Sequence, residues 1–177
     1  MHENRGLSKL MRKGKRLRLY LLGFIDAEGC FSVSLKKQKD ARFGWVLDPL
    51  FQVTQHKNYR IILELMKKEF SCGRIIEKPG QKDLLVFLVD NRRQLKEKVM
   101  PFFEKNPLVV KSEDFRLFKE IVEGLENKMH SDKETFKVLI RKAFNMNLRG
   151  KQRRHDLKEV LEDLDKQRIL RDHTPDS

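Results

Sequence analysis

The nine residues from Leu21 to Gly29, with the sequence LLGFIDAEG, constrain the fold of this chain more than any other stretch. Apolar side chains fall on overlapping sides of a helix predicted over residues 20–27, so this helix should be buried on several sides. Gly23 in mid-helix costs about 1 kcal/mol relative to alanine. That loss is most easily offset where a second backbone approaches closely. The stretch therefore predicts a helix packed tightly against another helix.

Two acidic residues, Asp26 and Glu28, end this predicted helix. The carbonyl groups at a helix C-terminus carry partial negative charge, so acidic side chains there are unfavourable unless a cation is present. Hard divalent cations bind carboxylate and carbonyl oxygens, and Gly29 permits a sharp exit into the next segment. The helix end is therefore a candidate metal site. The alternative is an ordinary helix that ends in a solvated acidic turn.

Composition indicates the kind of partner. The 177-residue chain suits one domain, and it carries a formal net charge of +13 with a pI near 9.8. A basic surface gains affinity for nucleic acid by releasing condensed counterions. The alternative is that the 37% of charged residues only solvate helix surfaces.

Several classes of protein and site are disfavoured by the sequence. No apolar run approaches the roughly 20 residues needed to cross a bilayer, so we expect no membrane partner and an intracellular location, in bacterial or archaeal cytoplasm or in an organelle. The basic start of the chain lacks the apolar core of a secretory signal, although a transit peptide stays conceivable. Cys30 and Cys72 have no zinc-ligand spacing, and the five histidines form no metal-binding pair at helical spacing.

Alternating polar and apolar residues after the acidic helix end predict strands. Residues 30–39 alternate, and a turn at 40–44 leads to a second alternating run around 51–54, which together predict a hairpin. A helix is predicted over 59–70, followed by a second hairpin from 74–78 and 84–89. The faces of 84–89 cannot be assigned, because this run is apolar throughout.

Helical patterns fill the rest of the chain. They cover residues 92–103, with an interruption at Pro101, then 112–126 with Ser112 as N-cap, 132–144 and 156–172. The basic segment 147–155 suits contact with phosphates, or it is a solvated linker. We predict a basic tail at 1–14, a core at 15–146 and a C-terminal segment with a helix at 147–177.

The segment 21–29 resembles the motif that names the LAGLIDADG homing endonucleases. It differs from the motif conservatively at Phe24 and Glu28, and Leu22 is a larger residue than the alanine of the motif. The six matching positions are Leu21, Gly23, Ile25, Asp26, Ala27 and Gly29. The resemblance is to the single-motif, homodimeric type encoded in ribosomal RNA group I introns. It implies an α+β fold in the order αββαββα, with a four-stranded antiparallel DNA-binding saddle and C-terminal helices.

The resemblance also implies site residues. Glu28 matches the metal-binding carboxylate, helped by the carbonyl of Ala27, with Mg²⁺ as the expected cofactor and Mn²⁺ or Ca²⁺ able to substitute for binding. Gln55 and Lys111 match a water-positioning glutamine and an active-site lysine. A basic residue expected at Tyr59 is absent, so Arg60 is the candidate substitute, with His56 and Lys57 left open.

A chain with one motif is expected to work as a homodimer on near-palindromic double-stranded DNA. The predicted dimer interface lies on the motif helix, at Leu21, Leu22, Gly23, Phe24 and Ile25. Polar strand faces and the basic segment are predicted to contact bases and phosphates. These candidates are Ser32, Ser34, Lys36, Gln38, Gln52, Arg74, Lys78, Asp83, Arg149, Lys151 and Arg153.

The function that the sequence favours is a site-specific, metal-dependent DNA endonuclease that hydrolyses both strands. The main alternative is a protein of the same fold that does not cut, either an RNA maturase that binds its host intron RNA or a DNA-binding regulator. A structural helix bundle with incidental resemblance is the third alternative.

Overall fold

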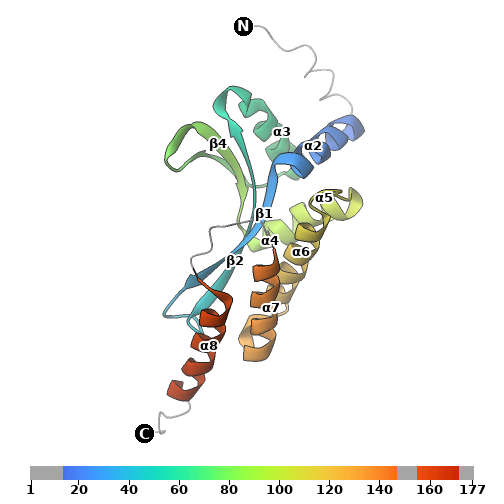
Figure 1. Ribbon diagram of the computed structural model, residues 1–177. Coiled ribbons are helices and arrows are strands. Elements are labelled where there is room, and N and C mark those ends of the chain that lie inside the picture. The colour runs from blue at the N-terminus through green and yellow to red at the C-terminus, as the bar shows by residue number, and fades with distance from the viewer. Residues whose placement is uncertain (1–13, 147–154, 172–177) are drawn as a thin grey trace. The chain divides into compact units, whose positions relative to one another are not determined.

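The computed structural model describes residues 14–146 and 155–171. The elements follow in the order α2 (Gly14–Glu28), β1 (Gly29–Lys37), β2 (Trp45–His56), η1 (Lys57–Tyr59), α3 (Arg60–Phe70), β3 (Arg74–Lys78), β4 (Gln81–Val89), α4 (Arg92–Gln94), η2 (Leu95–Val99), α5 (Met100–Lys105), α6 (Ser112–Glu126), η3 (Met129–Ser131), α7 (Lys133–Asn145) and α8 (Leu157–Arg171) (Figure 1). None of the described helices has the length and apolar character needed to cross a membrane. The predicted order of helix, two strands, helix and two strands is confirmed.

The chain forms two compact units. The motif unit comprises Met1–Cys30 and Leu50–Ser112, and the C-terminal unit comprises Phe31–Pro49 and Glu113–Ser177. Each unit is described by itself below. The domain boundaries predicted after residues 14 and 146 fall beside residues outside the described ranges, and they stay a prediction.

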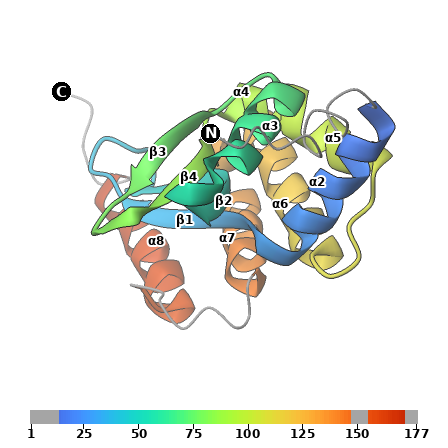
Figure 2. The same cartoon turned by 90° about the horizontal axis from the view of Figure 1, so that it is seen from above.

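The four strands form one antiparallel sheet in the order β1-β2-β4-β3. In the motif unit, the hairpin of β3 and β4 lies beside β2 (Figure 2), with Val53 of β2 opposite Phe87 of β4 and Ile75 of β3 opposite the same Phe87. Residues that lie directly opposite one another share a face of the sheet. The register therefore assigns each of the residues 84–89 to a face, which the uniformly apolar sequence of this run could not do.

One face of the sheet in the motif unit carries an aromatic core. Phe70 of α3 lies 5.7 Å from Phe51 and 6.0 Å from Phe87 between ring centroids, and Phe103 of α5 lies 5.6 Å from Phe51. Each of these rings is at most 3% exposed. Burial of this aromatic surface is the main force holding α3 and α5 against the sheet.

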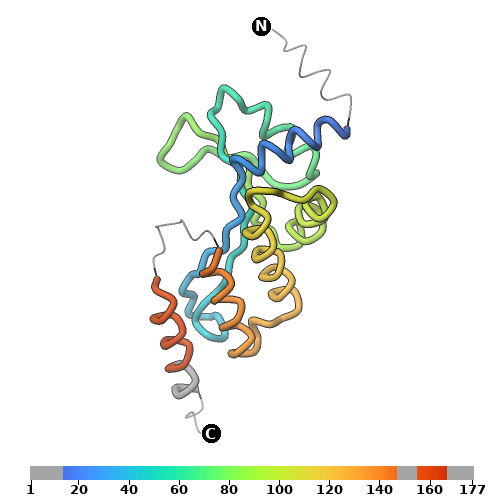
Figure 3. Tube along the Cα trace, turned by 45° about the vertical axis from the view of Figure 1, so that its right-hand side comes forward, coloured from blue at the N-terminus to red at the C-terminus, as the bar shows by residue number. Residues whose placement is uncertain are grey.

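The motif helix α2 begins at Gly14, six residues before the predicted start. Its buried residues Leu17, Leu21 and Ile25 recur every four positions, so they form one stripe along the helix. Helices α2 and α3 lie side by side (Figures 1 and 3), where Arg18 donates a hydrogen bond to Glu69 at 2.5 Å. The helix is therefore amphipathic within this chain, and the prediction that it is buried on several sides is wrong for the single chain.

Pro101 does not interrupt the helical path between residues 92 and 105. The backbone passes through a π-helical turn at η2, where the N–H of Met100 donates to the carbonyl of Leu95, and Pro101 then lies in the first turn of α5. A residue in a first turn needs no backbone N–H donor, so proline is tolerated there. The predicted break is replaced by a local change of helical pitch.

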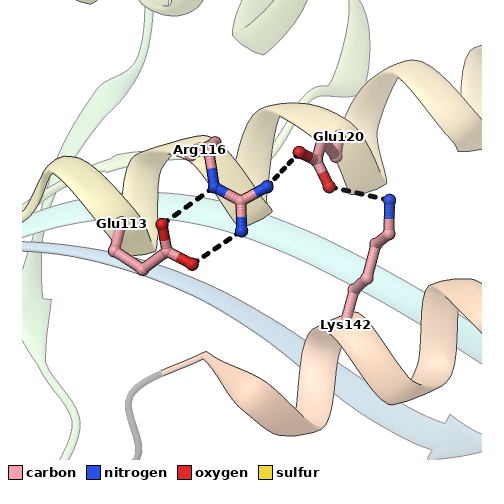
Figure 4. A network of polar contacts seen from close by, with 4 residues as sticks. All are labelled: Glu113, Arg116, Glu120 and Lys142. Carbon is pink, nitrogen blue, oxygen red and sulfur yellow. Dashed lines mark hydrogen bonds and ion pairs between the residues drawn. The ribbon is translucent and has the colours of Figure 1, made fainter.

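The C-terminal unit is held by apolar and ionic contacts. Phe31 of β1 lies 5.3 Å from both Phe115 and Phe118 of α6 between ring centroids. Arg116 of α6 binds Glu113 and Glu120, and Glu120 accepts a hydrogen bond from Lys142 of α7 at 2.7 Å (Figure 4). The network joins α6 to α7.

Helix α8 contacts the strands of the C-terminal unit through one carboxylate. The indole of Trp45 donates to Asp163 at 2.9 Å, and the ammonium of Lys37 lies 3.4 Å from the same carboxylate and 5.0 Å from the Trp45 ring centroid. Val160 and Leu164 of α8 are fully buried. Helix α8 is thus packed into this unit.

Candidate functional site

The acidic end of α2 passes from buried to exposed within four residues. Ile25 is fully buried, Asp26 is half-buried, and Ala27 and Glu28 are exposed. A Cβ added at Gly29 would lie 2.6 Å from the carbonyl oxygen of Ile25. Glycine is required there because the chain turns back closely over its own helix end, which gives a steric reason for the sharp exit predicted from the sequence.

The carboxylate of Asp26 binds a backbone segment that lies more than eighty residues further along the chain. Its oxygens accept hydrogen bonds from the backbone N–H groups of Val109, Val110 and Lys111, at distances of 2.9 to 3.0 Å. The Asp26 carboxylate therefore attaches the segment that leads into α6 to the end of α2.

The side chain of Lys111 binds the end of α2 in return. Its Nζ donates to the main-chain oxygen of Asp26 at 2.7 Å and to that of Ala27 at 2.8 Å. These carbonyls lie at the negative end of the helix dipole, so a cation is stabilised there. The positive charge that the sequence required at this helix end is thus supplied, in the protein alone, by Lys111.

The electrostatics of Asp26 follow from these contacts. Partial desolvation of its carboxylate would raise the pKa, but the hydrogen bonds from Val110, Lys111 and Val109 and the nearby Lys111 ammonium outweigh it and lower the pKa below its ordinary value. Asp26 therefore stays ionised at neutral pH and keeps the segment from Val109 to Lys111 attached to the helix end.

Other predicted site residues lie at the end of β2 and the start of α3. Gln55 accepts a hydrogen bond from the backbone N–H of His56 at 2.8 Å, and Arg60 is bound to Glu64 one turn along its own helix. Nδ1 of His56 accepts from the backbone N–H of Asn58 at 3.2 Å, which leaves Nε2 as the donor of the neutral ring. Among the described residues, neither Gln55 nor Arg60 is hydrogen-bonded to Asp26, Ala27 or Lys111.

Four predicted DNA contacts lie in the β2, β3 and β4 part of the motif unit. Gln52 and Arg74 flank Leu88 in one row across the sheet, and Arg74 makes a bidentate ion pair with Asp90 at 2.6 Å. Asp83 is exposed and forms an ion pair with Lys57. Lys78 ends β3 at an irregularity in the register. The structure therefore brings Gln52 and Arg74 to one face but pairs Asp83 with a cation.

Further predicted DNA contacts lie on β1, or directly after it, in the C-terminal unit. The hydroxyl of Ser34 lies 3.5 Å from the carbonyl oxygen of Asp48, and the Lys36 ammonium pairs with the Asp48 carboxylate. Ser32 is half-buried and Gln38 is exposed. The remaining candidates, Arg149, Lys151 and Arg153, lie outside the described residues.

The comparisons with known proteins bear on this geometry. Residues 21–122, which include the C-terminal half of α2, the sheet and Lys111, match the family model described as LAGLIDADG endonuclease. The chain belongs to the LAGLIDADG endonuclease family. It is 35% identical over 146 residues to the homing endonuclease I-ApeII of Aeropyrum pernix, which covers 80% of this chain and 86% of that relative.

Solved structures of LAGLIDADG proteins agree with the fold. The archaeal intron-encoded homing endonuclease I-Vdi141I, in complex with DNA, superposes with a TM-score of 0.83 at 38% identity, covering 89% of this chain and 99% of that chain. I-SmaMI, bound to uncleaved DNA target in the presence of calcium ions, gives 0.70 at 28% identity, covering 74% and 45%. The α+β fold predicted from the sequence, with its four-stranded antiparallel sheet, is therefore that of the LAGLIDADG endonucleases.

The residues predicted for the dimer interface are divided between two sides of the LAGLIDADG helix. Leu21 and Ile25 are fully buried inside the chain, whereas Leu22 and Phe24 are half-buried and Gly23 is exposed. The cause is the stripe of every fourth residue from Leu17 to Ile25, which packs into the core. Leu21 and Ile25 are therefore unavailable to a second copy, and the interface prediction is left with Leu22, Gly23 and Phe24.

Two features of this LAGLIDADG site escaped the sequence analysis. The exposed pair Val109 and Val110 has no periodic pattern, and only its backbone is used, so no side-chain signal marks it. The pairing of Lys57 with Asp83 joins residues of η1 and β4, and only the register places them together.

Proposed function

We propose that this chain is a site-specific homing endonuclease that hydrolyses both strands of a long, near-palindromic DNA target as a homodimer with a divalent metal. The observation that carries the proposal is the end of α2, where an exposed Glu28 carboxylate follows two main-chain oxygens that already bind a cation. The family match and the net charge of +13 support DNA as the substrate.

The donor set at this helix end fits Mg²⁺. Carboxylate and carbonyl oxygens are hard ligands of the kind that Mg²⁺ takes together with waters, and the Lys111 ammonium on the oxygens of Asp26 and Ala27 marks a place where positive charge is stabilised. In the described residues, no group of three or more Asp, Glu, His or Cys side chains could hold a metal. One chain therefore offers few ligands, and we infer that Glu28 of a second copy completes the set.

The second copy would pack on the exposed face of α2. Leu19 is 56% exposed and Tyr20 is 49% exposed, although both are large and apolar. A Cβ added at Gly23 would meet no atom within 4 Å from another part of the chain, so the cost of this glycine is not offset inside the protomer. A second α2 crossing at Gly23 would bury this face and bring the two Glu28 residues together at the symmetry axis.

The chain's own residues have distinct roles in the proposed reaction. When bound, a divalent cation would supply Lewis-acid chemistry for the phosphate and the attacking water. Glu28 and the Ala27 carbonyl would hold that cation, and the Lys111 ammonium would stabilise charge on the scissile phosphate. Gln55 would orient the attacking water, and Arg60 would supply the basic group absent at Tyr59. Asp26 positions Lys111 without contacting the phosphate.

Glu28→Gln tests this proposal. Cleavable sites are first selected from a random double-stranded DNA library with the wild-type protein and Mg²⁺. Binding to a selected site is then measured in Ca²⁺, and cleavage is measured in Mg²⁺. We expect the variant to keep binding and to lose cleavage by about 100-fold or more, because weakening even the surroundings of a metal site costs up to about that factor.

The matched control is Glu97→Gln, which removes an exposed carboxylate that pairs with Arg93 four residues earlier in the chain. This control should cut at the wild-type rate. Undiminished cutting by Glu28→Gln would remove Glu28 from the mechanism. Binding by the wild-type protein without any cleavage would favour the alternative of a DNA-binding regulator or an RNA maturase that binds its intron RNA.

A further inference from the structure

The face of the sheet turned away from α3 and α5 has an unusual composition. We call it the outer strand face, and the register defines it by three rows: Gln52, Leu88 and Arg74; Thr54, Val86 and Ile76; and His56 with Leu84. The middle strand, β4, contributes only aliphatic side chains to this face. The flanking strands contribute polar and basic residues together with one isoleucine.

These aliphatic residues are not part of the aromatic core. Leu85, Phe87 and Val89 alternate with them along β4 and point to the side where Phe70 and Phe103 pack. On the outer strand face, Leu84, Leu88 and Ile76 are only half-buried, and Val86 between them is 5% exposed. The outer strand face therefore contains an aliphatic strip, in which the side chains of Leu84, Leu88 and Ile76 are partly exposed and that of Val86 is buried between them.

Charged pairs border this aliphatic strip at both ends. Arg74 with Asp90 lies beside Leu88, and Lys57 with Asp83 lies beside Leu84. Both cations are about half exposed, 54% for each side chain. A ligand that suits this surface has negative charges to meet the basic side chains. It also has small apolar groups to contact the aliphatic strip, next to groups that can form hydrogen bonds with the amide side chain.

Duplex DNA matches that description, and its major groove displays a single kind of apolar group. The 5-methyl group of thymine is the only alkyl substituent on the base edges there, next to the acceptor O4 of the same base. A two-stranded β-ribbon fits the major groove, so a strand can place alternate side chains against successive bases.

We propose that Leu84, Leu88 and Ile76 bind thymine methyl groups, so that each half of the target requires thymine at the base pairs that lie against β4. The inference rests on the proposed function, since it assumes a DNA target bound by the sheet. It adds a specificity rule that the polar candidates do not give, because aliphatic side chains discriminate by the methyl group rather than by hydrogen bonds.

Replacing single thymines with deoxyuridine tests this directly, because the exchange removes the methyl group and keeps base pairing. The wild-type protein is titrated in Ca²⁺ with selected target duplexes that each carry one such replacement. At one or two positions in each half-site, we expect affinity to fall about three- to fivefold, the factor expected for losing one buried methyl group. A target variant with cytosine at the same position provides a second comparison. Replacing that cytosine with 5-methylcytosine restores the methyl group, so it should recover part of the lost affinity.

Two variants assign the effect to β4. With Leu88→Ala or Leu84→Ala, the ratio of affinities for the thymine and deoxyuridine targets should fall to about one at the affected position. Gln52→Ala is the matched control, because Gln52 lies opposite Leu88 on β2. It should weaken binding to both duplexes by the same factor and keep their ratio. Thermal unfolding of each variant shows that it is folded.

The outcomes separate this inference from the proposed function. Tight binding and cleavage with no position sensitive to deoxyuridine would overturn the inference and leave the endonuclease intact. Failure to select any DNA target would overturn both. If Leu88→Ala changes the oligomeric state and leaves the thymine-to-deoxyuridine ratio unchanged, the aliphatic strip is a protein interface and the inference is wrong.

Discussion

The side chain of Asp26 binds the backbone of Lys111, and the side chain of Lys111 binds the backbone of Asp26. The Lys111 N–H donates to Oδ1 of Asp26 at 2.9 Å, and the Lys111 Nζ donates to the main-chain oxygen of Asp26 at 2.7 Å. Each side chain thus fixes the other residue's backbone. The consequence is that the proposed metal-binding end of α2 and the lysine beside it form one rigid arrangement before DNA arrives.

Asp26→Asn should weaken this arrangement. The amide keeps one acceptor oxygen but loses the charge that strengthens three backbone hydrogen bonds, and hydrogen bonds to charged groups contribute about 1.5–3 kcal/mol. We expect a loss of that order in the free energy of unfolding, measured by urea denaturation, and slower cleavage with nearly unchanged DNA affinity. Ser112→Ala, which removes a neighbouring hydrogen bond to Val109, is the control. Equal stability of wild type and Asp26→Asn would show that the contacts are not maintained in solution.

Lys111→Met should separate metal binding from catalysis. Removing the ammonium frees the Ala27 carbonyl and removes a positive charge from the proposed metal site, and even two unit charges 4 Å apart in water repel by about 1 kcal/mol. Calcium should therefore bind about threefold to tenfold more tightly to the variant with DNA present, as measured by calorimetry, while cleavage in Mg²⁺ is lost. Weaker calcium binding would mean that Lys111 organises the ligands rather than competing for them. Lys98→Met on η2 provides a comparison with the same loss of charge.

Gly23→Glu should prevent dimerisation without disturbing the protomer. The position is exposed, and an added Cβ meets nothing within 4 Å from elsewhere in the chain, so the helix tolerates a side chain there. Two carboxylates facing each other across a helix crossing would repel and would also keep the backbones apart. Sedimentation velocity should show a monomer with unchanged helical circular dichroism. Lys67→Glu on the exposed surface of α3 should leave the dimer intact; a dimeric Gly23→Glu protein would refute the crossing at this glycine.

Glu120→Gln should reveal a pH-dependent contribution to stability. The hydrogen bond from Lys142, with Arg116 adding to it, lowers the pKa of Glu120 below its ordinary value despite partial desolvation. A lowered folded-state pKa adds stability above the unfolded pKa, and that stability disappears as the pH falls through the folded value. The substitution should cost about 0.5–1 kcal/mol at pH 7 and nothing at a pH well below the ordinary glutamate value of about 4.3. Urea denaturation at several pH values measures this, and a cost independent of pH would exclude the ionic explanation.

The sequence predicted the local elements well because each depends on nearby residues. The apolar periodicity of α3 and the acidic start of α6 predicted these two helices at nearly the bounds that the structure has. Alternation around 51–54 predicted the strand β2 but not its length, because β2 begins at Trp45. The π-helical turn before Pro101 was missed, because its cause is a shift of backbone hydrogen bonds rather than a side-chain pattern.

By itself, the sequence determined the family, the helix that ends in Asp26 and Glu28, and the order of strands and helices, because a motif and a periodicity are written in consecutive residues. Only the tertiary structure decided which side of α2 is buried, which side of β4 faces outward, and that Asp26 binds a backbone segment 83 to 85 residues away. A uniformly apolar strand has no period that distinguishes its faces, and a carboxylate does not specify its donors. Those choices follow from strand register and from packing between distant segments, which the whole chain sets together.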